Sequence, residues 1–230
     1  MNSIPSFPRV LGLFYLGVCF ITLALGLTSC NSDAGQKNPS AFMDDEAANI
    51  EMVEREDNYG NLERYSRRKS DYARQGIFSK FDKEGHLLEQ AQYENDTLHG
   101  IRVLFFEETG DTNVVENYNR GRFHGPYRVY YPSGKIELTA DYVNNVMEGE
   151  VKKYYETGEL METVTFQDNE ENGPFKEYYT NGNLKTEGFY MKGDNEHGLL
   201  KMFNEAGELV KTMNCQHGVC RTIWKAPGTE

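Results

Sequence analysis

The sequence predicts an all-β protein, an elongated single-layer antiparallel sheet of tandem β-hairpin repeats of about 24 residues. Two interleaved series of glycines keep this period, and apolar and polar residues alternate between them, as in half-buried strands. We call one series the first glycines: Gly76, Gly100, Gly125, Gly149, Gly173 and Gly198. The other series, the turn glycines, comprises Gly85, Gly110, Gly134, Gly158, Gly182 and Gly207.

Residues 1–29 are predicted to be a lipoprotein signal peptide. Val10–Leu27 contains no charged residue, and Arg9 precedes it. The run ends in Leu27-Thr28-Ser29-Cys30, which resembles the lipobox of bacterial lipoproteins. That resemblance implies cleavage before Cys30 and a diacylglycerol on its thiol, which anchors the protein in a membrane. The alternative is an uncleaved transmembrane anchor, since 18 residues nearly span a bilayer. Both predict export to an oxidising compartment.

Residues 30–58 are predicted to form the lipidated cysteine and a flexible or partly helical tether. Ser40 and the acidic residues after it are typical of a helix start, and such a helix would run through Val53. An irregular first strand that ends near Asp57 is the alternative, and the sequence does not choose between them. The repeat array is assigned to residues 59–230. Its locally basic start, Arg64 to Arg74, is either a solvated hairpin or a docking patch for an acidic partner.

Each repeat position has a predicted role. A leucine or similar residue lies two residues after most turn glycines, a small or aliphatic residue six after, and an aromatic eight after. These positions share parity, so they should line one face of the sheet and form ladders from repeat to repeat. The turn glycines suit a turn whose last residue has positive φ. The connections between repeats are predicted to be longer and polar, as in residues 144–148 and 167–172.

The pattern resembles the MORN repeat family, and more closely its bacterial variant, the antitoxin-like repeat proteins of the YwqK type. The resemblance covers about residues 59–228. It rests on paired tyrosines, on turn glycines followed by leucine, and on histidine–glycine pairs that open repeats: His99-Gly100, His124-Gly125 and His197-Gly198. It implies an elongated, twisted antiparallel sheet of consecutive hairpins that serves as a binding scaffold.

Composition argues against several functions. The net charge of −12 repels phosphate backbones, so no nucleic-acid partner is expected. Four of the five histidines immediately precede a glycine, and we interpret them as turn residues. Equivalent positions lie about 10 Å apart, too far for one metal ion. No catalytic motif or cofactor-binding loop is present, so we expect neither a metal, nor a cofactor, nor an enzymatic activity.

The predicted function is a non-catalytic scaffold in the cell envelope, lipid-anchored, with the outer membrane as the expected location. Its binding face is assigned to six tyrosines: Tyr130, Tyr131, Tyr154, Tyr155, Tyr178 and Tyr179. Members of each pair should point to opposite faces, so one row should be partly exposed, as recognition surfaces are. The partner is an unknown protein. A glycan or cell-wall module is one alternative, because tyrosines stack on sugars, and an antitoxin or immunity protein is another.

The last two cysteines are predicted to form a disulfide. Cys215 occupies an aromatic position of earlier repeats, and Cys220 follows Gly218, which we count as a first glycine. The short connection between them should bring their Cα atoms within bonding range. Two free thiols, or a metal pair with His217, are the alternatives. The disulfide, with Trp224 folded over the last leucine ladder, should cap the array.

Overall fold

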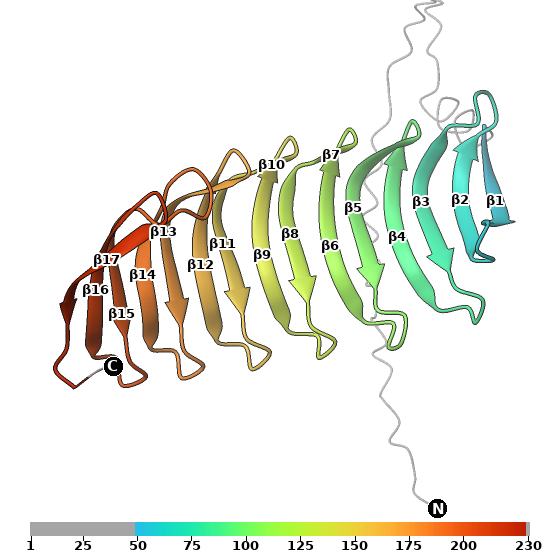
Figure 1. Ribbon diagram of the computed structural model, residues 1–230. Coiled ribbons are helices and arrows are strands. Elements are labelled where there is room, and N and C mark those ends of the chain that lie inside the picture. The colour runs from blue at the N-terminus through green and yellow to red at the C-terminus, as the bar shows by residue number, and fades with distance from the viewer. Residues whose placement is uncertain (1–48, 229–230) are drawn as a thin grey trace, which may run out of the picture. The chain divides into compact units, whose positions relative to one another are not determined.

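The computed structural model describes residues 49–228, which form one open antiparallel sheet with strands side by side (Figure 1). No helix occurs among these residues, and the all-β prediction is confirmed. The strands are β1 (Ile50–Glu56), β2 (Leu62–Arg68), β3 (Arg74–Phe81), β4 (Leu87–Glu94), β5 (Thr97–Phe105), β6 (Thr112–Asn119), β7 (Arg122–Phe123), β8 (Gly125–Tyr130), β9 (Ile136–Val143), β10 (Val146–Met147), β11 (Gly149–Tyr154), β12 (Leu160–Gln167), β13 (Glu170–Tyr178), β14 (Leu184–Tyr190), β15 (Gly198–Phe203), β16 (Leu209–Gln216) and β17 (Val219–Lys225).

The strands pair in chain order, with two exceptions. β7 and β8 both pair with β6, and β10 and β11 both pair with β9, so each of these two couples is one strand interrupted once. The interruption lies just before a first glycine, Gly125 or Gly149. Each hairpin therefore contacts mainly its neighbours along the chain, as in other repeat proteins.

The turn glycines close the hairpins as predicted. Each has positive φ, for example 78° at Gly134 and 107° at Gly158. In the turn before β9, the amide of Gly134 donates to the carbonyl of Tyr131 at 2.8 Å, and the amide of Tyr131 donates to the carbonyl of Lys135 at 2.8 Å. A β-branched or bulky residue would be strained at such a φ, so glycine recurs here.

The connections between repeats differ from the prediction of longer polar loops. Asn144 and Asn145 have φ of 53° and 71°, and Asp168 and Asn169 have φ of 54° and 66°. Two consecutive residues with positive φ make the tight turn that joins neighbouring strands of a twisted sheet. The other residues of the two predicted loops are not loop residues. Val146, Met147, Gln167 and residues 170–172 belong to strands, and Glu148 is the interruption before Gly149.

The first glycines lie in β-bulges. His99, Gly100 and Ile101 lie opposite the single residue Gln92, because Ala91 pairs with Arg102 and Tyr93 pairs with Leu98. Gly100 has a φ of 101°, which a bulge commonly requires. The bulge explains why this glycine keeps the repeat period although it is not in a turn.

The histidines are, with one exception, not in turns between repeats. His99 lies within β5, and His124 and His197 precede β8 and β15, so all three adjoin bulge glycines. Only His217, among the described histidines, lies in a two-residue turn, with a φ of 50°. Its ring centre is 5.7 Å from that of His197, closer than the repeat spacing predicts. The amide of Gly218 donates to the carbonyl of Glu196 at 3.1 Å, so this turn lies against the residue before His197.

The sheet begins at Ile50, earlier than the predicted boundary at residue 59. β1 pairs with β2 from Ile50 opposite Arg68 to Glu56 opposite Leu62. The strand alternative is therefore correct for residues 50–56, and the helix alternative is wrong there. The predicted signal peptide, Cys30 and most of the predicted tether lie outside the described residues.

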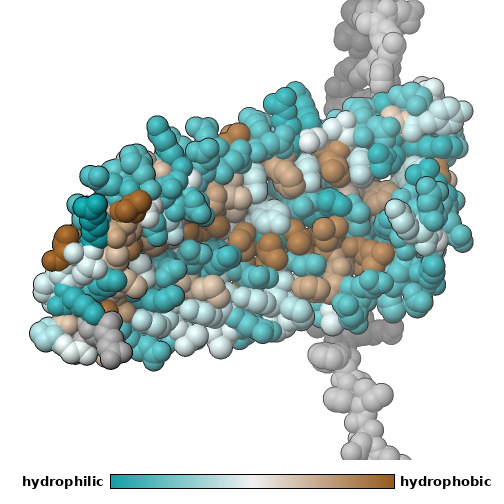
Figure 2. Space-filling model, viewed as in Figure 1, coloured by the Kyte–Doolittle hydropathy of each residue, from teal (hydrophilic) through white to brown (hydrophobic). Residues whose placement is uncertain are grey.

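One face of the sheet, which we call the ladder face, carries the packed side chains. Large residues two after a first glycine lie directly opposite small ones six after a turn glycine: Phe78 opposite Ala91, Tyr127 opposite Ala140, and Phe175 opposite Gly188. Phe78, Ala91, Ala140 and Phe175 are buried. Figure 2 shows hydrophobic side chains in a band across the face in view, with hydrophilic residues on both sides. The small and aromatic positions of the predicted ladder lie on this face. The position two after the turn glycine does not, because a register shift pairs Ile136 with Tyr130, whose side chain is on the other face.

Candidate binding face

The face opposite the ladder face, which we call the open face, carries an exposed apolar row. The residue after each first glycine lies on this face, because the next residue along the strand faces the ladder. Ile77, Ile101 and Leu199 are 54%, 52% and 51% exposed. We define the apolar row by its five members: Ile77, Ile101, Pro126, Pro174 and Leu199. Glu150 takes the same position in the remaining repeat and interrupts the row.

The bulges hold this row in place. The side chain of Asn117 on β6 donates to the carbonyl of Pro126 at 2.6 Å, and the hydroxyl of Thr165 on β12 donates to the carbonyl of Pro174 at 3.1 Å. Each bond joins a bulged strand to the strand before it. The row is therefore fixed by side-chain bonds as well as by the backbone ladder, and little order would be lost on binding.

A shallow groove lies at the C-terminal part of the row. Phe189, 40% exposed, pairs with Pro174 on the neighbouring strand. Together with Leu199 they line a depression of about 200 Å³, and Lys176 and Lys201 also line it. Glu187 accepts a hydrogen bond from Nζ of Lys201 at 2.7 Å. The groove thus combines an apolar floor with charged groups, as small docking pockets on protein surfaces do.

Sequence reasoning missed the apolar row. The signal was present, since an apolar residue follows the first glycine in five of six repeats although alternation makes this a solvent position. An apolar residue that recurs with the repeat period but is not buried is not explained by packing. The tyrosines are the more abundant signal in the sequence, and the prediction of a binding face therefore rests on them.

The six predicted tyrosines are half-buried rather than exposed. The hydroxyls of Tyr131, Tyr155 and Tyr179 donate to backbone carbonyls one repeat further on, those of Tyr154, Tyr178 and Phe203, at 2.7, 2.7 and 2.9 Å. Burial, and then the negative charge of Glu137, raise the pKa of Tyr131. These three tyrosines connect successive repeats, and a role of the six in binding a partner stays a prediction.

The basic run at the start of the array is neutralised by its neighbours. Arg64 lies 2.6 Å from Glu54, Arg67 lies 2.7 Å from Glu51, and Arg68 lies 2.8 Å from Asp71. Two of these carboxylates come from β1, the strand that sequence reasoning left undecided. The arrangement favours the solvated hairpin over a docking patch for an acidic partner.

A charged cluster interrupts the ladder face. Arg102 contacts Glu89 at 2.7 Å and Glu116 at 3.0 Å, and the hydroxyl of Tyr118 lies 3.1 Å from the same Glu116. Burial, and then the charge of Glu116, raise the pKa of Tyr118 to about 12. The guanidinium thus compensates a buried carboxylate at the position that Ala91 or Ala140 occupies elsewhere. The cluster is a structural ion pair within the sheet.

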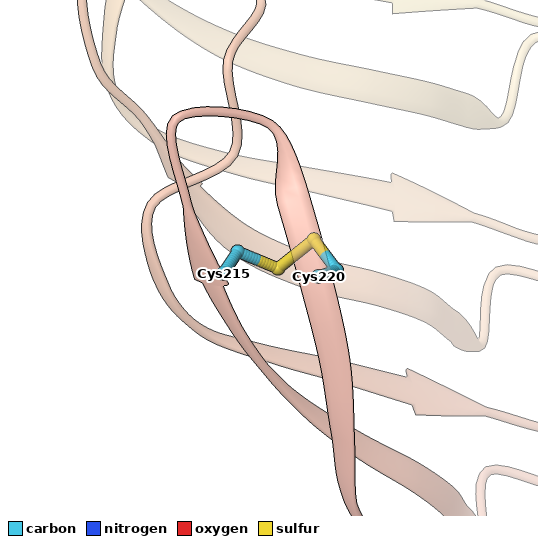
Figure 3. Close-up of a disulfide and its surroundings, with 2 residues drawn as sticks. All are labelled: Cys215 and Cys220. Carbon is cyan, nitrogen blue, oxygen red and sulfur yellow. A yellow bond between two sulfur atoms is a disulfide. The ribbon is translucent and has the colours of Figure 1, made fainter.

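Cys215 on β16 and Cys220 on β17 are joined by a disulfide (Figure 3). They lie directly opposite each other, with Cα atoms 4.0 Å apart. Cys220 occupies the position of Leu98 and Phe123, not that of Arg102 and Tyr127, because Gly218 belongs to a two-residue turn like that of Gly121. Trp224 is 45% exposed and lies opposite Thr212, so it does not cover the last leucine ladder.

Within residues 49–228, no three His, Cys, Asp or Glu side chains gather closely enough to hold a metal ion. The same part of the chain contains no helix long and apolar enough to cross a membrane. These findings concern the sheet alone. The predicted anchor lies outside it.

Comparison with known proteins identifies the repeat. The MORN repeat variant family matches residues 74–95, 123–144, 147–168 and 171–192. Each match begins just before a first glycine and ends at the tight turn between repeats. No curated protein matches the chain. Four segments of this sheet therefore match the MORN repeat variant, and the chain is a tandem repeat protein.

Proposed function

We propose that this protein is a non-catalytic repeat scaffold of the cell envelope that binds another protein through the open face of its sheet. The observation that carries the proposal is the apolar row, exposed at one repeat position. Fully burying a side chain such as isoleucine contributes about 1.5–3 kcal/mol, so even half-exposed residues can supply useful binding free energy. Because the row is fixed by the bulges, that free energy is not offset by much loss of freedom.

Protein binding is favoured over the two alternatives by particular contacts. The tyrosines that would stack on sugars are half-buried, and three of their hydroxyls already bond to backbone carbonyls. An antitoxin role has no support of this kind, and it fits poorly with the export signal that we predict for residues 1–29. A partner protein needs only exposed apolar surface with polar groups at its rim, and the open face offers both.

Attachment to a membrane through Cys30 belongs to the same proposal. It rests on Leu27-Thr28-Ser29-Cys30 and on the polar residues that follow. Cys30→Ser should leave an unprocessed precursor without acyl groups, whereas the natural protein should begin at an acylated Cys30. Mass spectrometry of protein recovered from membranes distinguishes the two. A natural protein that begins at Met1 with no acyl mass would instead support the uncleaved anchor.

Binding through the open face can be tested with a photo-crosslinking amino acid placed in living cells at Ile101 or at Leu199. Lys153, an exposed residue on the ladder face, provides the matched control position. We expect one protein to be crosslinked from both positions of the apolar row and not from residue 153. The same adduct from all three positions, or none from the row, would contradict the proposal.

A further inference from the structure

The open face carries a second row, made of cations. The residue three after the first glycine is basic in four successive repeats, and we define these four as the cation row: Arg128, Lys152, Lys176 and Lys201. It shares parity with the apolar row, and no register shift separates the two positions in β8, β11, β13 or β15. The two rows therefore run side by side across the sheet. Two residues along a strand separate them by about 7 Å, and the period along each row is about 10 Å.

The cations of this row are available to a ligand. Arg128 and Lys176 are exposed, and neither makes an ion pair within the described residues. Lys152 pairs with Glu150 at 3.0 Å, with side chains 41% and 52% exposed, and Lys201 pairs with Glu187 at 2.7 Å, with side chains 38% and 29% exposed. Such exposed pairs contribute about 0–1 kcal/mol and exchange readily for a better partner. By contrast, Arg64, Arg67 and Arg68 near the N-terminus all have carboxylate partners.

The arrangement is unexpected in a protein of net charge −12. No packing contact requires a cation at this position, since Ser79 and Val103 occupy it in the two earlier repeats. The cation row begins where those repeats end, and it reaches the groove formed by Pro174, Phe189 and Leu199. Lys176 and Lys201 also line that groove, so the apolar floor and the positive charge belong to one site.

We infer that the open face binds an acidic segment of a polypeptide, whose carboxylates contact the cation row while an apolar side chain enters the groove beside Leu199. This inference names the chemistry of the partner and rests on the function proposed above. A polypeptide accounts for both rows, because carboxylates and apolar side chains occur together in it. A phosphate polymer would leave the apolar row unused, and Glu150 and Glu187 would repel its closely spaced charges.

A peptide probe can match both rows. In an extended polyproline helix, every third side chain points the same way at about 9 Å intervals, close to the period of the array. A 15-residue peptide of five Glu-Leu-Pro repeats therefore presents one carboxylate and one leucine per repeat of the sheet. The same peptide with lysine in place of glutamate is the charge control. Fluorescence anisotropy of each labelled peptide with the purified full-length protein measures its affinity.

The variant that tests the inference is Arg128→Glu/Lys176→Glu. Lys153→Glu/Lys211→Glu, on the ladder face, changes the net charge by the same amount and serves as its control. We expect the acidic peptide to bind the natural protein at least tenfold more tightly than the basic one, with an affinity that falls as salt rises. The cation-row variant should lose at least tenfold in affinity, and the control should lose less than threefold. Each variant places a glutamate opposite another one, Glu187 or Glu162, so a lower melting temperature is expected for both, and circular dichroism should show that both keep the β-sheet spectrum of the natural protein at the assay temperature.

Three results would overturn the inference: no binding of the acidic peptide, equal binding of both peptides, or equal losses in the two variants. Stronger binding to vesicles containing phosphatidylglycerol, abolished by the cation-row variant, would overturn it in favour of a lipid surface. The crosslinking experiment separates this failure from failure of the proposed function. If Ile101 and Leu199 crosslink a protein while the acidic peptide does not bind, the scaffold function stands and only the partner's chemistry is wrong.

Discussion

Gly188→Ala should destabilise the protein, although alanine normally suits a strand better than glycine. A Cβ at residue 188 would lie 2.7 Å from Cε1 of Phe175 and 2.8 Å from Cδ1 of Leu200, closer than carbon atoms approach without repulsion. Phe175 has little room to move away, because it is 3% exposed and stacks on Tyr190 with ring centres 4.0 Å apart. The added methyl group therefore overfills the ladder face at this position.

Two opposing effects set the size of the change. Replacing glycine within a strand gains about 0.5–1 kcal/mol of backbone entropy. Overpacking a rigid core costs about 1–3 kcal/mol. We expect the free energy of unfolding to fall by about 1–2 kcal/mol, as measured by urea denaturation followed by circular dichroism.

A second substitution tests the cause. Phe175→Leu/Gly188→Ala removes the ring that the methyl group would strike, so the two changes together should cost less than the sum of each alone. Residues in contact typically show a coupling of about 0.5–3 kcal/mol in such a cycle. A Gly188→Ala variant as stable as the natural protein, or strictly additive effects in the cycle, would refute the argument from packing.

Three further predictions concern the turns, the ladder face and the C-terminus. Gly158→Val should cost more than about 1 kcal/mol in the same denaturation assay, since residue 158 has a φ of 107° that valine does not tolerate; a neutral result would mean that the turn rearranges freely. Burial and Glu116 raise the pKa of Tyr118 from 10.0 to about 12, so the stability from its neutral hydroxyl is complete below pH 10 and is lost as pH rises toward 12. Tyr118→Phe should therefore lose less stability than the natural protein between pH 10 and pH 12, and equal slopes would contradict this. Cys215 and Cys220 should resist alkylation in native exported protein, and reduction should increase hydrogen exchange in β16 and β17 alone; two freely alkylated thiols, or loss of the whole fold, would contradict the disulfide or its local role.

Three features could be predicted from the sequence: the hairpin period, the positive φ of the turn glycines and the ladder face. All three depend on positions that accept few residue types. A residue that must adopt positive φ or fill a ladder position is restricted in type, so these positions repeat visibly. Gly134 and Ala140 are of this kind. The tight turns between repeats left a weaker signal, because asparagine and aspartate also tolerate positive φ. Asn144-Asn145 satisfies such a turn without any glycine.

The errors at the C-terminus share one cause. A glycine in a bulge and a glycine in a tight turn look alike in sequence, since both have positive φ. Counting Gly218 as a first glycine shifts the position of Cys220, although Gly121 shows the same two-residue turn earlier in the chain. Distinguishing the two requires the pairing partners. In this sheet the bulge at Gly100 is recognised by three residues opposite Gln92, and long-range pairing of that kind is not encoded in local residue preferences.

The candidate site was hard to predict because the same alternation produces both faces of the sheet. A single-layer sheet needs to pack on one face, and that requirement determines the large and small residues of the ladder face. Residues on the open face do not have to meet this packing requirement, so a regular pattern of residues there needs another cause. The apolar row and the cation row keep the repeat period without burial. The apolar row begins at Ile77 and the cation row only at Arg128, and both end in the repeat of Gly198. A structural constraint would act on every repeat alike. The cation row is confined to part of the array, as the proposed binding of a partner of limited length predicts, and the proposal places the centre of that contact between Arg128 and Lys201.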